Sequence, residues 1–349
     1  MNIRTYQSML PVVNYDSKRV FRVISEAYKG AGMMSVNHKL REYPDKTFIG
    51  YDINSAYQSV LLDNNYPYGN IWTKDNINIP YQELLNIVED RFYVAYVEVR
   101  NLKLKFENFD VISYSSMLDY CEGVWFGWLN NVDIDNMTKL YDGTIIIKSL
   151  AVFEHNAPLS DYLKSYINCC YDTIHNMKKG KERKNLKLEF NIMTYGKNAQ
   201  KRYTQSGEEN GLRSRYVHIA MYQAAYTRKR IIDLLVKYND SIIYTDTDSI
   251  YLDSKVKFEE PISDKIGEFK VEQPECKLYI FRYKGYIIFN LDDSIRIQKV
   301  AGINTMLTLD EINRIKKGEV IESKVVLENG ETQLVKVYDK FTYGVKIFI

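Results

Sequence analysis

Tyr244-Thr245-Asp246-Thr247-Asp248-Ser249 is the stretch that decides the fold, because strand-forming residues flank it on both sides. Residues 241–244 and 250–252 are mostly β-branched or aromatic, as strands prefer. We therefore expect a β-hairpin with Asp246 and Asp248 at its tip. If the tip is near-extended, side chains two residues apart point the same way. Two carboxylates so close raise each other's pKa unless a cation lies beside them.

A divalent metal would satisfy this pair, since carboxylate oxygens suit Mg²⁺ or Mn²⁺. An EF-hand calcium loop is excluded, because counting from Asp246 places Tyr251 where glycine belongs and Lys257 where glutamate belongs. The alternative is an Asp-rich turn that is simply solvated. A metal site would need a third carboxylate from elsewhere in the chain.

Composition describes an ordinary globular protein. The 349 residues are enough for one large core or two to three small ones, and 45% are hydrophobic and 26% charged. A net charge of +2 means that any surface for nucleic acid must be local. The four cysteines lack metal or redox spacing, as is typical of reduced thiols. With no signal peptide and no apolar run of membrane length, we expect a cytoplasmic protein without a membrane partner.

Asp52 supplies the third carboxylate. Residues 48–52 are typical of a strand that ends in this acid, and residues 53–59 then open a helix. A carboxylate beside a helix N-terminus suits a metal-bound triphosphate, because the free amides there donate hydrogen bonds to phosphate oxygens. Asp52, Asp246 and Asp248 together fit two-metal phosphoryl transfer. The alternative for Asp52 is a plain helix cap.

Two stretches resemble family B DNA polymerases. Asp52-x-x-Ser55-x-Tyr57-x-Ser59 is similar to their motif A, with Gln58 where the family usually has proline, and residues 244–249 are similar to motif C. The resemblance implies an α+β right-hand polymerase fold: a palm with an antiparallel sheet, helical fingers and a small β-rich thumb.

The same resemblance implies the roles of the site residues. Asp52, the backbone carbonyl of Ile53 and Asp248 would hold two Mg²⁺ or Mn²⁺ ions, and Asp246 would support them. Ser55, Ala56 and Tyr57 would bind the nucleotide, with the Tyr57 ring excluding a 2′-hydroxyl.

A basic stretch at 178–184 and the residues after it resemble motif B of the fingers. Lys184, Lys187 and Asn191 share one side of a helix, which suits gripping a triphosphate while Tyr195 lies against the base. Family members place the tyrosine seven residues after the lysine, and this chain places it eight after Lys187. Either a bulge absorbs the extra residue or Lys184 shares the lysine's task. A basic run is otherwise a solvated face.

Further residues are assigned to the primer-template. The loop with Tyr28, Gly30 and Gly32 would approach a phosphate chain, or it is a helix C-cap and turn. Lys284-x-Tyr286 resembles the family's K-x-Y, which contacts the primer near its 3′ end, and Thr245 is assigned with it. Residues 128–135 resemble the protein-primed subgroup of phages and linear plasmids. Their acids Asp133 and Asp135 fall where a helix begins, which favours capping.

The expected domains follow this order of motifs. Residues 1–44 form an N-terminal segment, 45–155 and 200–290 the palm, 156–199 the fingers, and 291–349 the thumb. A long helix over 211–235 would pack behind the catalytic hairpin. In the thumb, a helix over 309–317 leads to two strands joined at Asn329-Gly330, a strong hairpin signal.

These observations predict a DNA-directed DNA polymerase acting on primer-template DNA and dNTPs, with a terminal-protein hydroxyl as a primer at initiation. Only residues 1–51 precede Asp52 and they contain no D-x-E, so we expect these residues to carry no 3′–5′ exonuclease, a separately encoded exonuclease being a candidate partner. A phage-encoded enzyme would work in the bacterial host cytoplasm. The alternatives are a catalytically silent palm that binds nucleic acid or terminal protein, and a primase or reverse transcriptase. Tyr57 and the spaced Asp-Thr-Asp speak against the last two.

Overall fold

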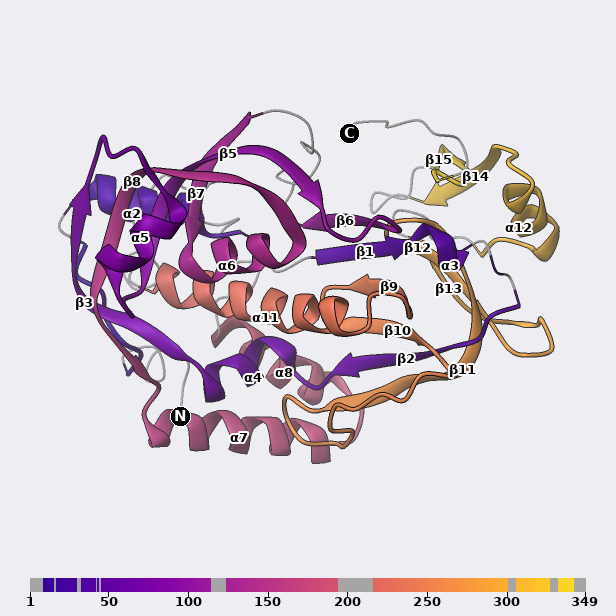
Figure 1. Ribbon diagram of the computed structural model, residues 1–349. Helices are drawn as coiled ribbons and strands as arrows, with labels where there is room; N and C mark the ends of the chain where they lie inside the picture. The colour runs from indigo at the N-terminus through magenta and orange to yellow at the C-terminus, as the bar shows by residue number, and fades with distance from the viewer. Residues whose placement is uncertain are drawn as a thin grey trace.

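The computed structural model describes residues 9–15, 17–29, 33–41, 43, 45–113, 124–193, 216–300, 306–326 and 332–341. Within them the chain forms three antiparallel sheets and several helices (Figure 1). None of the helices in these ranges is long and apolar enough to cross a membrane.

The central sheet has eight strands and carries the predicted catalytic hairpin. From edge to edge its strands are β13 (Ile295–Val300), β12 (Gly285–Phe289), β11 (Phe269–Arg282), β2 (Phe48–Ile53), β10 (Ser249–Asp253), β9 (Ile242–Asp246), β1 (Met33–Asn37) and β6 (Phe109–Ser113). Strand β2 is therefore an inner strand, and apolar residues of β2, β9 and β10 are buried in it.

A second sheet is built from long, bent strands. Its order is β3 (Asn65–Lys74), β8 (Tyr141–Pro158), β5 (Tyr93–Leu104) and β7 (Val124–Asn130), with β4 (Ile79–Pro80) on β8. The helices α5 (Tyr81–Val88) and α6 (Asn131–Leu140) accompany it.

Helix α11 (Val217–Lys237) runs through the middle of the molecule (Figure 1). It contacts α2 (Lys18–Ala27), α4 (Ala56–Asp63) and α6, and its small residues Ala220, Ala224 and Ala225 are buried there. The long helix predicted before the hairpin is thus confirmed, although its first residues, 211–215, lie outside the described part.

The remaining elements stand at the periphery. Helix α7 (Asp161–Asn176) lies at the bottom of Figure 1, and α8 (Lys181–Met193), which follows it, lies below α11 in that view. On the opposite side, α12 (Leu309–Lys316) begins with a Thr308–Glu311 capping box and leads into β14 (Ile321–Val326) and β15 (Thr332–Val337). These elements confirm the predicted thumb helix and strand pair, because β14 and β15 are antiparallel partners.

After β15 the chain returns to the central sheet. Asp339, which is buried, binds Arg41 at the end of α3 (His38–Arg41) and accepts a hydrogen bond from Tyr279 Oη at 2.9 Å. The Lys340 amide donates to the Phe281 carbonyl at 2.8 Å. The segment after β15 is therefore fastened to β11 and α3.

Candidate active site

The hairpin of β9 and β10 presents Asp246 and Asp248 on a tight turn. Thr247 between them has a left-handed φ of 64°, and the Asp248 amide donates to the Asp246 carbonyl at 2.7 Å. The Thr247 amide donates to the carbonyl of Met33 at 2.7 Å. The hairpin prediction is confirmed, but the near-extended tip is wrong, because the left-handed residue reverses the chain between the two acids.

Main-chain pairing fixes Asp52 beside Asp248. Strand β2 lies between β10 and β11, with Asp52 opposite Ser249, and the Ile53 amide donates to the Asp248 carbonyl at 3.0 Å. Asp52 is not the cap of α4, since that position belongs to Ser55. Two acids that lie 196 residues apart in sequence thus meet where the end of β2 pairs with the start of β10.

Lysines neutralise part of this acidic site. Lys270 Nζ lies 2.6 Å from Asp52 Oδ1, and Lys284 Nζ lies 2.9 Å from Asp246 Oδ1. For Asp248, burial raises the pKa of the carboxyl to about 7, and the charges of Asp52 and Asp246 add to the shift. Asp248 therefore carries the charge that is least compensated.

The residues fit a divalent cation. Within the described ranges no three His, Cys, Asp or Glu side chains form a group that could hold a metal by themselves. Mg²⁺ does not need one, because it usually binds one or two carboxylates and takes its other ligands from water and substrate phosphates. Asp52 at the end of β2 and Asp248 in the turn before β10 are such a pair of carboxylates.

The start of α4 has an unusual backbone that suits phosphate binding. Ser55, its N-cap, has a left-handed φ of 48° and its side chain makes no capping hydrogen bond. A non-glycine residue in this region is strained, and such strain is found at functional sites. The first amides of a helix have no acceptor within it, and Ala56, which is buried, begins this helix.

Tyr57 lies one residue further along α4. Its carbonyl accepts a hydrogen bond from Gln223 Nε2 of α11 at 2.6 Å. Burial raises the pKa of its hydroxyl, and the charges of Asp248 and Asp246 raise it further. The Tyr57 hydroxyl is thus close enough to Asp246 and Asp248 for their charges to act on it.

The fingers assignments are only partly described. Lys184 and Lys187 are exposed on α8, and no hydrogen bond or ion pair joins either side chain to the acids among the described residues. Helix α8 is regular from Lys181 to Met193, so a bulge would have to fall after it. Asn191 lies in α8, but its side chain, like Tyr195, lies outside the described part.

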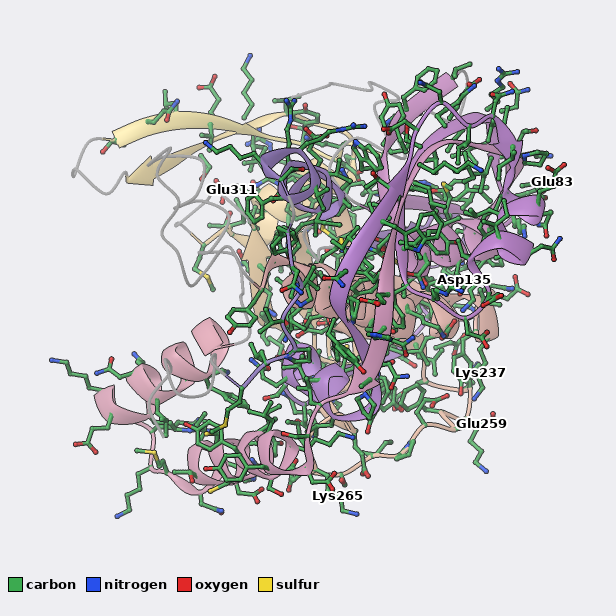
Figure 2. All side chains as sticks on the ribbon, turned by 90° about the vertical axis from the view of Figure 1, so that its left-hand side faces the viewer. Glu83, Asp135, Lys237, Glu259, Lys265 and Glu311 are labelled. Atoms are coloured by element: carbon green, nitrogen blue, oxygen red, sulfur yellow. The ribbon has the colours of Figure 1, made fainter. Side chains whose placement is uncertain are left out.

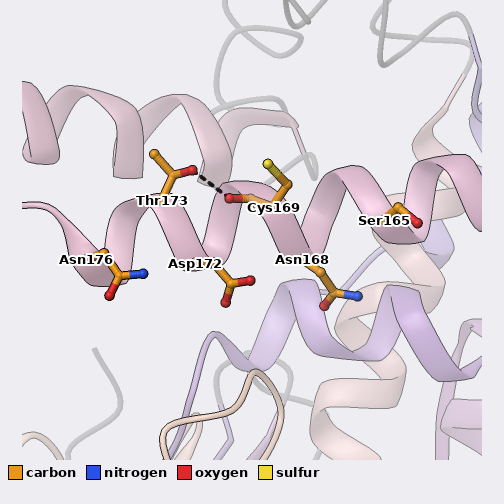
Figure 3. Close-up of a pocket in the computed structure, with 6 residues that line it drawn as sticks. All are labelled: Ser165, Asn168, Cys169, Asp172, Thr173 and Asn176. Carbon is orange, nitrogen blue, oxygen red and sulfur yellow. Dashed lines mark hydrogen bonds between the residues drawn. The ribbon is translucent and has the colours of Figure 1, made fainter.

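Figure 3 shows a shallow hollow along the exposed face of α7. None of the predicted site residues lines it; its lining residues are Ser165, Asn168, Cys169, Asp172, Thr173 and Asn176.

The primer-template assignments fall into exposed and buried residues. Tyr28 is the half-buried C-cap of α2, and Gly30 and Gly32 lie outside the described part. Lys284 occupies a left-handed turn between β11 and β12, where its amide donates to Tyr244 Oη at 3.1 Å. Thr245 is fully buried, with its hydroxyl 2.9 Å from that of Ser35. Contacts of these residues with DNA stay predictions.

Tyr286 is mainly a core residue. Only 3% of it is exposed, and its ring packs against Tyr244 and Tyr251 at centroid distances of 5.3 and 5.8 Å. This packing ties β12 to the catalytic hairpin. Of the K-x-Y pair, Lys284 is therefore the better placed to reach a ligand.

Sequence reasoning missed the partners of two acids. Asp133 does not cap α6, because Asn130 does; the Asp133 carboxylate is fully buried and binds Arg228 of α11, whose Nη2 lies 2.7 Å from both of its oxygens. Arg228 Nη1 also donates to the Lys29 carbonyl at 3.1 Å. Asp135, by contrast, is half exposed, on the side of the molecule that carries Glu83 and Lys237 (Figure 2).

Nothing local in the sequence marks either partnership. Arg228 lies in a long helix, and Lys270 faces Asp52 only because β11 pairs with β2 in one particular register. Glu272, two residues beyond Lys270, adds its charge to the acidic site, since it too raises the pKa of Asp248. Lys270 and Glu272 could have been predicted only from the register of β11 on β2.

A family comparison decides the relationship that these acids suggest. The model of the family described as DNA polymerase type B, organellar and viral, matches residues 2–207. The chain belongs to this family. The matched residues include Asp52 and all of α4, α7 and α8.

Similar proteins support the fold. A DNA polymerase of Streptococcus phage Cp-1 is 25% identical in an alignment of 321 residues that covers 81% of this chain and 53% of that protein. The structure of Phi29 DNA polymerase with primer-template DNA and incoming nucleotide has a TM-score of 0.68 at 20% identity, covering 97% of this chain and 65% of that one. The complex of Phi29 DNA polymerase with single-stranded DNA has a TM-score of 0.66 at 18% identity, with the same coverage.

Two facts follow from these comparisons. The predicted α+β right-hand polymerase fold is confirmed by the likeness to Phi29 DNA polymerase. The chain spans about half the length of the curated relative that it matches.

Proposed function

We propose that this chain is a DNA-directed DNA polymerase that adds dNTPs to a primer 3′-hydroxyl with two Mg²⁺ or Mn²⁺ ions. The observation that carries the proposal is the pairing of β2 with β10, which sets Asp52 beside Asp248 through the 3.0 Å bond from the Ile53 amide. Membership of the type B family and the likeness to the complex of Phi29 DNA polymerase with primer-template DNA and nucleotide support it.

The proposed roles follow from where the residues lie. Asp52, Asp248 and the Ile53 carbonyl would hold the ions, which when bound lower the barrier for the attacking hydroxyl and stabilise the leaving oxygen. Asp246 shapes the site through its ion pair with Lys284. Asp248 has to give up its proton to bind a cation, since its pKa is raised to about 7.

Nucleotide positioning is assigned to α4 and α8. The first amides of α4, after Ser55, donate hydrogen bonds to phosphate oxygens of the nucleotide. Tyr57 packs under the sugar. Lys184 and Lys187 project from α8, where their ammonium groups are exposed to an incoming triphosphate. We keep Asn191 and Tyr195 in the same roles that the motif B resemblance gives them.

Primer extension tests the proposal. Asp52→Asn and Asp248→Asn are expected to lose nucleotide incorporation while binding primer-template almost as the wild type does, because phosphate contacts dominate affinity. Asp135→Asn is the matched control, an acid of the decoy D-x-D that is half exposed on α6. Wild-type extension by the Asp52 variant would refute the site.

The substrates offered in the same assay separate the rival functions. Incorporation of dNTPs on a primed DNA template supports the polymerase. Synthesis of ribonucleotides without a primer would indicate a primase, and preference for an RNA template a reverse transcriptase. Tight binding of DNA without incorporation would indicate a silent palm.

Three finer expectations stay proposals. We expect a terminal protein to prime initiation, which labelling of that protein by a radioactive dNTP would reveal. We expect these 349 residues to leave 3′-labelled single-stranded DNA intact, so that trimming depends on a separate exonuclease. We also place the activity in the bacterial host cytoplasm, as for a phage enzyme.

A further inference from the structure

Lys270 is held opposite Asp52 by the sheet itself. The two residues are direct partners in the antiparallel pairing of β11 with β2, and Lys270 Nζ lies 2.6 Å from Asp52 Oδ1. The Cβ atoms of such partners lie about 5 Å apart whatever the side chains do. The ammonium therefore stays within reach of this carboxylate in every state in which the sheet is folded.

The surroundings of the Lys270 side chain allow its ammonium group to move away from Asp52. Its side chain is 43% exposed, whereas that of Asp52 is 19% exposed. A lysine ends in a compact charge on a flexible four-carbon stem, and an ion pair exposed to this degree contributes little to stability. The Lys270 ammonium can thus give up its contact with Asp52 and become hydrated at a small cost in free energy.

The charge of Lys270 acts on both proposed metal ligands. It touches Asp52 and also favours the ionised form of Asp248, which forms no ion pair with any residue that the structure describes. Lys284 neutralises Asp246 instead, at 2.9 Å. Among the described residues, Lys270 is therefore the cation that forms an ion pair with the Asp52–Asp248 pair.

We propose that Lys270 is a resident counter-ion that occupies Asp52 in the absence of a divalent metal and competes with the metal for this carboxylate. The inference rests on the metal site of the proposed function. Lys270 then sets the metal concentration that the enzyme requires.

The expected size of the effect follows from Coulomb's law. Charges of +1 and +2 about 6 Å apart in a water-like medium repel enough to change a dissociation constant roughly tenfold. Lys270→Met removes the charge and keeps the length of the side chain. Its dissociation constant for Mn²⁺, measured without DNA or nucleotide by the signal of free Mn²⁺ in electron paramagnetic resonance, should fall roughly tenfold.

Two variants control this experiment. Lys270→Arg keeps the charge and should bind Mn²⁺ as the wild type does. Lys277→Met removes a lysine of the same strand whose Nζ lies 2.8 Å from Asp293 Oδ1, outside the site. This variant should leave the dissociation constant for Mn²⁺ unchanged. Because Lys270→Met binds Mn²⁺ more tightly, Mn²⁺ should raise its melting temperature more than that of the wild type.

The outcomes separate the inference from the function on which it rests. If Asp52→Asn abolishes Mn²⁺ binding but Lys270→Met binds no more tightly than the wild type, the counter-ion role is overturned and the metal site stands. If Asp52→Asn leaves Mn²⁺ binding unchanged, the proposed metal site is wrong, and the proposed role of Lys270 is then wrong as well. Tighter binding by Lys270→Met alone supports the inference.

Discussion

Replacing Arg228 by methionine should be among the costliest single changes in this protein. The substitution removes contacts of 2.7, 2.7 and 3.2 Å to Asp133 and one of 3.1 Å to the Lys29 carbonyl. It leaves a carboxylate that is fully buried, with the Asn130 side-chain amide at 2.7 Å. Breaking a buried ion pair in this way costs about 3–5 kcal/mol, so we expect the free energy of unfolding to fall by that amount.

Chemical denaturation measures this loss, and the neighbouring residue provides the control. Lys229 pairs with Asp233 at 2.7 Å on the partly exposed side of the same helix, and Lys229→Met should cost less than about 1 kcal/mol. The double variant Arg228→Met/Asp133→Leu should recover most of the loss, because it removes the buried charge as well. If Arg228→Met costs no more than Lys229→Met, the reasoning is refuted.

Three further changes test other parts of the structure. Asp248 has a pKa of about 7 when folded and 3.8 as an ordinary carboxyl, so the wild type loses stability as the pH rises from about 4 to 7 and this carboxyl ionises. In chelator, the free energy of unfolding of Asp248→Asn should therefore exceed that of the wild type at about pH 8, by at most about 4 kcal/mol. The difference between the two should narrow towards pH 5. Tyr57→Val should raise ribonucleotide relative to deoxyribonucleotide incorporation, whereas an equal loss of both rates would make Tyr57 a packing residue. Gly50→Ala would place a Cβ 2.9 Å from both Gln273 Cβ and Tyr251 Cε1, and should lower the free energy of unfolding by about 1–3 kcal/mol; an unchanged unfolding curve would contradict the crowding.

Local patterns in the sequence were sufficient to predict the hairpin that carries Asp246 and Asp248 and the strand pair of β14 and β15. Strand-forming residues around 244–249 predicted the hairpin, and Asn329-Gly330 between two strand-like runs predicted the pairing of β14 with β15. Such signals depend on residues close together in sequence, where backbone preferences and turn geometry act.

Features that depend on pairing between distant segments could not be predicted in this way. Lys270 meets Asp52 through the register of β11 on β2, and Arg228 meets Asp133 through the packing of α11 on α6. The turn at Asp246 and Asp248 was expected to be extended, but Thr247 adopts a left-handed conformation that its side chain does not favour. The Thr247 amide reaches a carbonyl of β1, a strand more than 200 residues earlier in the chain.

The return of the chain at Asp339 has a mechanical consequence for the thumb. The chain leaves the central sheet after β13, at one edge, and comes back to β11 and α3 through Asp339 and Lys340. The part of the chain that carries α12, β14 and β15, which we predict to be the thumb, is therefore attached to the central sheet at two points. A body attached at two points turns most easily about the line that joins them, so this part should rotate about that line and resist twisting about its own length.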